Sequence, residues 1–467
     1  MMNFKAYNNI TKIVIPDNVQ LSNNYFYNKF SEMKNLQSVS LPNSVNSLNS
    51  TFQNCLSLNM SPWCGNNVTD MRNAYYNCSN LTGSPICGPN VMKMQWAYYN
   101  CANLTGNPVC GENVTSMYST YENCVNLTGS PVCGENVTGM NYAYRNCVNL
   151  TGSPVCGPNV INMYSTYENC VNLTGSPVCG ENVTGMSYAY RNCVNLTGSP
   201  VCGENVTYMY STYENCVNLT GSPVCGENVT GMSYAYENCV NLTGSPVCGE
   251  NVTNMRNAYR NCINLTGSPV CGNNVTNMKR TYDGCSNLTG CPICGPNVTS
   301  MEDTYNGCIN LSCNAYFYSK YLNGIRNCFY IRNTSAPLRV YVPMNSKTFH
   351  TVYHRNIYSD YSLIGREITW TDDMLTNNCY YNTTYNLYLY PVESVAKSYL
   401  NNELGNTFEP IDDNEYISNY NATSSIKTTW NYSASSLPID AGEAFIVNIN
   451  VADLTSITLN SMGVVYR

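Results

Sequence analysis

The sequence is poor in charged residues. Asp, Glu, Lys and Arg make up 11% of its 467 residues, less than half of the share in an ordinary globular protein. Its 22 basic residues are outnumbered by 29 acidic ones and form no stripe that could neutralise phosphates. This composition excludes a nucleic-acid partner, and it leaves solubility to Asn, Ser, Thr and the Tyr hydroxyls.

Histidine is nearly absent, and so are the motifs of enzymes. The two histidines, His350 and His354, are spaced i,i+4 on an expected helix, but no H-E-x-x-H motif or fixed carboxylate accompanies them. We therefore interpret them as surface residues. Nucleophile elbows, phosphate-binding loops and dinucleotide fingerprints are also missing. We predict a non-enzymatic protein without a cofactor or a metal.

Long hydrophobic runs are lacking as well. No apolar stretch reaches the length of a transmembrane helix, and the N-terminus has no apolar core of signal-peptide length. We expect no membrane span. If the protein acts outside its cell or on a virion surface, we expect it to get there without a recognisable leader.

What the sequence does contain is a repeat. The 23 residues Tyr118–Met140 return unchanged at Tyr164–Met186 and at Tyr210–Met232, with near-copies such as Asn141–Met163 between them. A super-period of 46 residues therefore overlies the 23-residue period. Two cysteine columns follow the same frame, one from Cys55 to Cys308 and one from Cys64 to Cys294. Self-similarity at such a period predicts a solenoid of stacked coils.

The repeat resembles a known family. Its first copies carry an I-x-x-I-x-I-P-x-x-V frame from Ile10 to Val19 and a similar frame from Leu36 to Val45. Later copies add a Val-Thr pair, an Ala-Tyr pair, a Cys and a Leu, as in Val137-Thr138, Ala143-Tyr144, Cys147 and Leu150. Over roughly residues 10–313 this pattern is similar to the BspA-type leucine-rich repeat of bacterial surface proteins. The resemblance implies one short strand per coil on one face and a short helix or 3₁₀ turn on the other.

The spacing within one coil gives the same expectation. Apolar residues at Met140, Ala143, Tyr144, Cys147 and Leu150 fall on one helical stripe. A three-residue strand is expected at 155–157, after Gly and Pro have ended the helix.

The expected core holds five residues per coil, with their equivalents every 23 residues: Tyr121, Cys124, Leu127, Val137 and Met140. Side chains of a strand alternate between inward and outward. This alternation points Val132 inward when it is counted from Leu127, and Cys133 inward when it is counted back from Val137. We favour Cys133, because a column of exposed thiols would be a liability.

The expected fold is an α/β repeat solenoid with a C-terminal α+β module. We divide the chain into an N-terminal repeat cap at 1–52, regular repeats at 53–313 and the module at 314–467. Segments 338–365 and 388–412 resemble the strand–Pro–helix unit that often closes this repeat family. Alternating apolar residues from Phe445 to Leu459 predict antiparallel strands.

The 27 cysteines favour stacked, reduced thiols. Zinc sites need pairs spaced C-x₂₋₄-C, whereas the two cysteine columns lie 9 and 14 residues apart, and only Cys291 and Cys294 form a C-x-x-C pair. Intra-coil disulfides such as Cys124–Cys133 are the alternative. The sequons at Asn126 and Asn136 are interpreted as turn residues that hydrogen-bond the backbone rather than as glycosylation sites.

Two charge columns differ in kind. One mostly alternates in sign, which predicts exposed ion pairs between neighbouring coils: Glu122, Arg145, Glu168, Arg191, Glu214, Glu237 and Arg260. The other has one sign and is interpreted as solvated rather than as a Ca²⁺ site: Glu112, Glu135, Glu181, Glu204, Glu227 and Glu250.

These features favour an adhesion or attachment protein, either on a bacterial surface or on a phage particle as a tail fibre or head decoration. Identical coils present the same groups repeatedly, which suits a repeating ligand such as a host-surface glycan. The candidate contact residues are tyrosines, whose rings and hydroxyls suit sugars: Tyr118, Tyr142, Tyr164, Tyr188, Tyr210 and Tyr234. A host-surface protein is a second possible partner. Segment 314–467 is the expected docking site for other surface or virion proteins, and a homo-oligomer is possible. The alternative function is a spacer or intracellular scaffold without a ligand.

Overall fold

The computed structural model describes residues 9–19, 26–311 and 315–319, single residues up to 328, and the backbone of three later strands. It falls into two compact units, Met1–Thr266 and Gly267–Arg467. The division at residues 52 and 313 stays a prediction. Both histidines, the helices expected after residue 342 and the strands expected at 445–459 lie outside the described residues.

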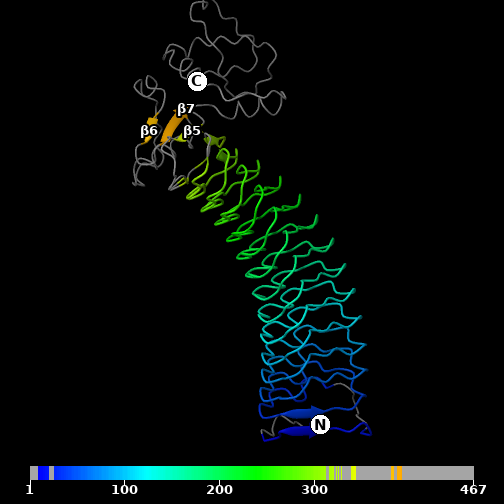
Figure 1. Cartoon of the computed structure of the whole chain (residues 1–467). Coiled ribbons are helices and arrows are strands. Elements are labelled where there is room, and N and C mark those ends of the chain that lie inside the picture. The colour runs from blue at the N-terminus through cyan, green and yellow to red at the C-terminus, as the bar shows by residue number, and fades with distance from the viewer. Residues whose placement is uncertain are drawn as a thin grey trace, which may run out of the picture. The chain divides into compact units, whose positions relative to one another are not determined.

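The first unit is a stack of 23-residue coils (Figure 1). At its start, strand β1 (Lys12–Val14) pairs in parallel with β2 (Ser38–Ser40). From there on, one isolated parallel bridge per coil continues the stack, beginning with Ser47↔Asp70 and ending with Gly231↔Asn254. The solenoid and its period are thus as predicted.

The expected helix is replaced by consecutive turns, and no described residue is helical. In the coil that begins at Tyr118, the N–H groups of Thr120 and Cys124 donate to the carbonyl oxygens three residues before them. Ser119 and Asn123 have φ of 49° and 65°, as the third residue of a type II turn requires. Alternate N–H groups donate instead to the next coil, for example Tyr121 to the carbonyl of Ala143 at 2.9 Å and Asn123 to that of Arg145 at 2.8 Å. A helix cannot form because alternate donors are used between coils.

Within the regular repeats at 53–313, the expected strand occurs only at Ile293–Cys294 and is absent from the coils before it. Pro131 has no N–H to donate, and Val132 pairs with a side chain rather than with a neighbouring strand. The Tyr144 hydroxyl accepts from the Val132 N–H at 3.0 Å and donates to the Val132 carbonyl at 2.6 Å. One buried tyrosine thus satisfies both backbone groups, and the bridge recurs in the coils from Tyr75 to Tyr305. The N-terminal coils have Phe30 and Phe52 at this position instead.

The core is as predicted: the side chains of Tyr121, Cys124, Leu127, Val137 and Met140 are fully buried, and so are their equivalents in the regular coils. The buried tyrosine rings stack nearly parallel, with Tyr121 and Tyr144 5.6 Å apart at 10°. The core thiols hydrogen-bond backward along the stack, as Cys124 does to the carbonyl of Tyr98 at 3.0 Å.

The expected inward position of Cys133 is wrong. Both Val132 and Cys133 are half-buried, and the buried residue of this segment is Pro131. Cys133 Sγ lies along the stack instead, where it would be 2.9 Å from a Cβ placed on Gly157. Reduced thiols were predicted, and 24 described cysteines indeed form no disulfide, whereas Cys291 is in one. Cys294 is among the 24, so Cys291 and Cys294 are not bridged to each other.

The second unit begins with further coils and continues into a five-stranded sheet of order β3-β4-β5-β7-β6. Its strands are β3 (Ile293–Cys294), β4 (Ala315–Phe317), β5 (Leu338–Val342), β6 (Tyr380–Asn382) and β7 (Leu387–Pro391). All pairs are parallel except β6 with β7. Strands β5 and β7 confirm the strand parts of the two predicted strand–Pro–helix units.

Candidate functional site

The predicted contact tyrosines all lie on the first turn of their coils, directly after the buried Met. Tyr118 follows Met117 at once, whereas Tyr142 stands two residues after Met140 and has φ of 57°. The alternate coils therefore place their ring one residue later, on the left-handed turn position that Ser119 occupies in the coil of Tyr118.

The structure brings these rings into one row, which we call the aromatic ladder: Trp96, Tyr118, Tyr142, Tyr164, Tyr188, Tyr210 and Tyr234. Neighbouring ring centroids are 4.9–5.6 Å apart, and neighbouring planes meet at 61–68°. This edge-to-face geometry is one that aromatic pairs prefer. The sequence analysis missed Trp96, because it occupies the Tyr142 position in a coil outside the identical copies.

Cations cover every second tyrosine of the aromatic ladder. The guanidinium carbons of Arg145 and Arg191 lie 5.7 Å from the ring centres of Tyr142 and Tyr188, and Arg256 lies 5.8 Å from that of Tyr234. Burial, followed by the neighbouring Tyr164, raises the pKa of Tyr142 to about 12. Its hydroxyl therefore stays protonated at neutral pH and can donate a hydrogen bond.

The alternating charge column does form ion pairs, but they are less exposed than expected. Arg145 lies 3.3 Å from Glu122 and 3.1 Å from Glu168, and Arg191 repeats this between Glu168 and Glu214. Glu122 and Glu168 are only 7% and 6% exposed. Burial lowers the pKa of Arg191, but the two carboxylates outweigh it and raise that pKa overall. Arg145 and Arg191 beside the aromatic ladder are thus already neutralised.

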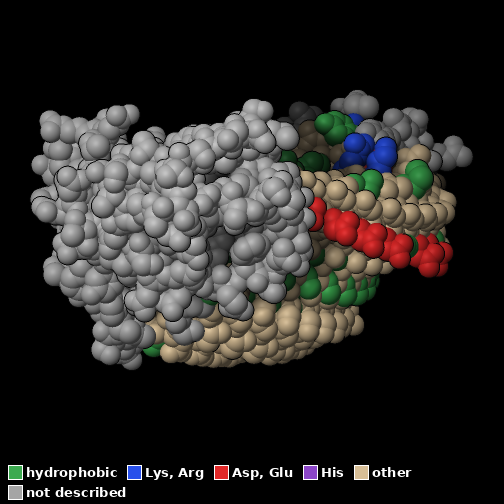
Figure 2. Space-filling model, turned by 90° about the horizontal axis from the view of Figure 1, so that it is seen from above, with side chains coloured by type: hydrophobic (Ala, Val, Ile, Leu, Met, Phe, Trp, Pro, Cys, Tyr) green, Lys and Arg blue, Asp and Glu red, His purple; other side chains and the backbone are tan. Residues whose placement is uncertain are grey.

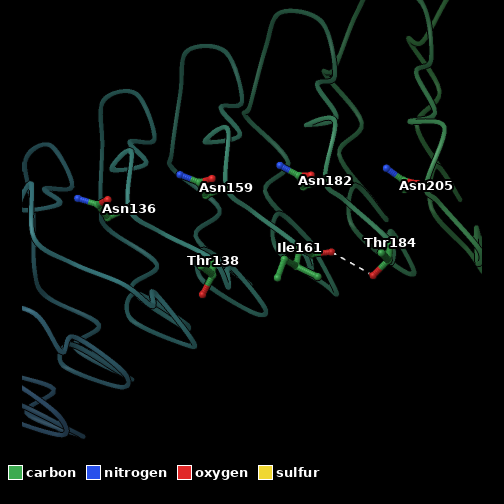
Figure 3. A pocket seen from close by; sticks show the side chains of 7 residues that line it. All are labelled: Asn136, Thr138, Asn159, Ile161, Asn182, Thr184 and Asn205. Atoms are coloured by element: carbon green, nitrogen blue, oxygen red, sulfur yellow. Dashed lines mark hydrogen bonds between the residues drawn. The ribbon is translucent and has the colours of Figure 1, made fainter.

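A second surface feature is a shallow groove of about 640 Å³ that crosses four coils (Figure 3). It is lined by Asn136, Thr138, Asn159, Ile161, Asn182, Thr184 and Asn205. Three of the four amides belong to sequons, whereas Asn159 is followed by Val-Ile. All four donate to carbonyl oxygens of the preceding coil, as Asn136 does to Glu112 at 2.9 Å. Thr184 likewise donates to the Ile161 carbonyl at 3.3 Å. These contacts support the structural interpretation of the sequons and leave the groove few free donors.

The single-sign glutamate column is solvent-exposed throughout, and Figure 2 shows acidic side chains in a row on the surface. No group of three or more His, Cys, Asp or Glu that could hold a metal occurs among the described residues. Burial raises the pKa of the Cys124 and Cys133 thiols to about 12, so neither is a nucleophile at neutral pH. Within the part of the chain that the structure describes, no helix is long and apolar enough to cross a membrane.

Comparison with known proteins identifies the repeat. The sequence profile of the BspA-type leucine-rich repeat region, which comprises six copies, matches residues 2–128 and 119–243. No curated protein sequence matches the chain.

Several solved structures are similar. A leucine-rich repeat protein from Bacteroides ovatus has 15% identity and a TM-score of 0.48, with 73% of this chain and 89% of that chain covered. A leucine-rich cell surface protein from Faecalibacterium prausnitzii has 17% identity and a TM-score of 0.34, with coverages of 66% and 88%. YopM from Yersinia enterocolitica has 12% identity and a TM-score of 0.36, with coverages of 67% and 60%.

Proteins built from such repeats generally act through structure and binding rather than catalysis. The profile covers more than half of the sequence, and the coil geometry agrees with it. The chain belongs to the BspA-type leucine-rich repeat family.

Proposed function

We propose that this chain is a non-enzymatic attachment protein of a bacterial surface, and that it binds a repeating ligand such as a host-surface glycan along the aromatic ladder. The observation that carries the proposal is the ladder itself. Six tyrosines and one tryptophan form a continuous row on one face, with rings that a sugar can stack on and hydroxyls that can hydrogen-bond.

Membership of the repeat family supports a binding function in general. The near-identical coils support binding through many weak contacts at once. Each additional coil that engages the same ligand adds an intramolecular contact, so avidity grows without any strong single site. The phage setting has no support beyond the sequence pattern and is not carried into the proposal. The docking role of segment 314–467 stays a prediction.

One observation favours a different function, that of a spacer. The rings of the aromatic ladder contact one another and three arginines, so they also stiffen the stack. A spacer would need the ladder for stability and would bind nothing with it.

The test compares the full chain with its Tyr118→Ser/Tyr164→Ser/Tyr210→Ser variant for binding to host cells and to a glycan array. We expect the triple variant to bind at least about tenfold more weakly, because three stacking contacts are lost together. The matched control is Asn136→Ser/Asn159→Ser/Asn182→Ser, which changes three coils at the groove instead.

Both variants are first compared with the parent chain by circular dichroism, so that loss of fold is not read as loss of binding. If the tyrosine variant kept full binding while the groove variant lost it, the groove would be the site. If the parent chain bound no cell and no glycan, the spacer function would replace the proposal.

A further inference from the structure

The aromatic ladder repeats every two coils, not every coil. Tyr118, Tyr164 and Tyr210 open the three identical 23-residue copies, and no described cation lies over their rings. The tyrosines between them each carry an arginine on one face. Tyr164 and Tyr210 are exposed, at 38% each, and Tyr118 is half-buried. The rings available for stacking therefore recur with the 46-residue super-period.

Three glycines beside the ladder follow the same two-coil period. Gly139, Gly185 and Gly231 stand in the bridge column, where each pairs with a residue that has a side chain, such as Ser116 and Asn162 on either side of Gly139. From Ser116 to Asn254, this column thus alternates between a residue with a side chain and a glycine. We call the positions of Gly139, Gly185 and Gly231 the glycine gaps.

The fold does not require glycine at these positions. None of the three is among the residues with φ in the left-handed region. A Cβ on Gly139 would come no closer than 3.8 Å to any atom, and one on Gly185 would meet only the amide oxygen of Asn162, at 3.3 Å. By contrast, a Cβ on Gly134 would lie 3.2 Å from the carbonyl oxygen of Gly111, and Gly129 has φ of 81°. The gaps therefore keep surface space open rather than serve the packing of the chain.

The two-coil period has a definite length. Parallel chains stack about 4.8 Å apart, so two coils span about 10 Å. A β-1,4-linked polysaccharide is an extended ribbon whose sugars turn over at each linkage, so its repeat is a disaccharide of closely similar length. It offers the same C–H face at every second sugar. An extended peptide repeats every two residues, about 7 Å, and does not match.

Charge narrows the ligand further. Over the stretch from Tyr118 to Tyr210, the arginines beside the ladder are Arg145 and Arg191. Each is held between two carboxylates, so they offer no free positive charge to an acidic polymer. Arg256 lies beyond this stretch, over Tyr234. A neutral chain therefore suits the stretch best.

We propose that the aromatic ladder binds a neutral β-1,4-linked polysaccharide in register, with every second sugar on Tyr118, Tyr164 or Tyr210 and each intervening sugar over a glycine gap. This inference rests on the proposed function and names its ligand class. Three platforms two coils apart would engage about five or six sugars of one chain.

The experiment measures binding of the full chain to oligosaccharides by isothermal titration. The probes are cello- and chito-oligosaccharides of two to six sugars, with α-1,4-linked maltohexaose as the comparison. We expect the β-1,4 hexasaccharides to bind at least about tenfold tighter than the disaccharides, because three platforms act together. Maltohexaose, which coils, is expected to bind at least about tenfold more weakly than either hexasaccharide.

The glycine gaps are tested with Gly139→Thr/Gly185→Thr, which fills two of them. We expect it to lose most hexasaccharide binding and to keep its unfolding midpoint. The matched control is Asn162→Ser, which copies the residue of the Ser116 coil into a position that already has a side chain and should bind normally.

The two proposals fail in different ways. Equal binding of the α- and β-linked hexasaccharides, or full binding by the glycine variant, would overturn the ligand assignment while cell attachment through the tyrosines could still stand. Cell binding that survives loss of all three platform tyrosines would overturn the proposed function itself.

Discussion

At the scale of single residues, one asparagine per coil has two structural tasks. Asn169 has φ of 64°, and its amide nitrogen donates to the amide oxygen of Asn146 at 2.6 Å. The amide of Asn192 donates to Asn169 in the same way. Asparagine suits both tasks because it tolerates the left-handed region better than other residues with a Cβ and carries both a donor and an acceptor.

Substitutions at Asn169 separate the two tasks. Asn169→Gly keeps the backbone conformation and loses two side-chain hydrogen bonds, so we expect a loss of about 1–2 kcal/mol in unfolding free energy. Asn169→Ala loses the same bonds and also strains the turn, which should cost about 1 kcal/mol more. Denaturant titration of the full chain measures both. Equal losses would show that the turn conformation imposes no cost on a residue with a Cβ.

Buried thiols and phenols make stability depend on high pH. Burial raises the pKa of Cys124 and Cys133 from 9.0 to about 12, and it raises the pKa of core tyrosines such as Tyr144 well above 10.0. Both groups are neutral when protonated, so above pH 9 the unfolded chain loses protons before the folded chain does. Their contribution is therefore fully present below about pH 9 and is lost as the pH rises toward 12.

We expect unfolding midpoints that change little from about pH 6 to about pH 8 and fall steeply above pH 9. Above pH 9, each such group lowers the unfolding free energy by at most about 1.4 kcal/mol per pH unit. The fully buried core tyrosines, such as Tyr144, should become tyrosinates only as the chain unfolds, so part of the rise in tyrosinate absorbance should coincide with unfolding. Ionisation of all the tyrosines before the chain unfolds would contradict burial of the core hydroxyls.

At the scale of the element, a tyrosine hydroxyl takes the place of a β-ladder. Tyr144→Phe would leave the N–H and carbonyl of Val132 without the partner they share. Because an unpaired polar group in a partly buried segment costs about 1–3 kcal/mol, we expect a loss of about 2 kcal/mol or more. The control is Tyr118→Phe on the surface ladder, which should change stability by less than about 0.5 kcal/mol. Similar losses in the two variants would argue against the bridge.

The same element shows where sequence reasoning reaches its limit. The columns of Tyr121, Cys124, Leu127, Val137 and Met140 could be predicted, because a strict period fixes which residues face the core. The path of the backbone between these core residues could not be predicted. Spacings of three, four and seven suit a helix, but here they arise from successive turns. The deciding contacts, such as the Tyr144 hydroxyl on Val132, join residues of neighbouring coils that no local pattern pairs.

The candidate site was predictable to a similar degree. The tyrosine columns could be named from the repeat, but their merging into one row depends on the one-residue offset between Tyr118 and Tyr142 and on the turn that compensates for it. The arginine over every second ring follows from that geometry, which the sequence shows only as a 46-residue period.

At the scale of the whole molecule, the 46-residue period predicts which deletions the stack tolerates. Deleting 141–163 removes 23 residues and keeps every coil complete, but it places Glu122 beside Glu168 without Arg145 between them. Both carboxylates are nearly buried and both are paired with Arg145 in the intact chain. Deleting 141–186 removes 46 residues and brings Arg191 to the position of Arg145, so the alternation of charge and of ring offset is restored.

Because repeat stability is close to a sum over coils and their interfaces, both deletions remove favourable terms in proportion to length. The shorter one should nevertheless be the more harmful, by about 1–3 kcal/mol, since it buries two like charges without their shared cation. Thermal and denaturant unfolding of the two shortened chains, at low and at high salt, measures the difference. We expect high salt to reduce the difference in stability, because screening weakens the repulsion between the two carboxylates. If the 46-residue deletion were the less stable at both salt concentrations, register in this solenoid would be set by its core columns alone and the alternating charges would have no part in it.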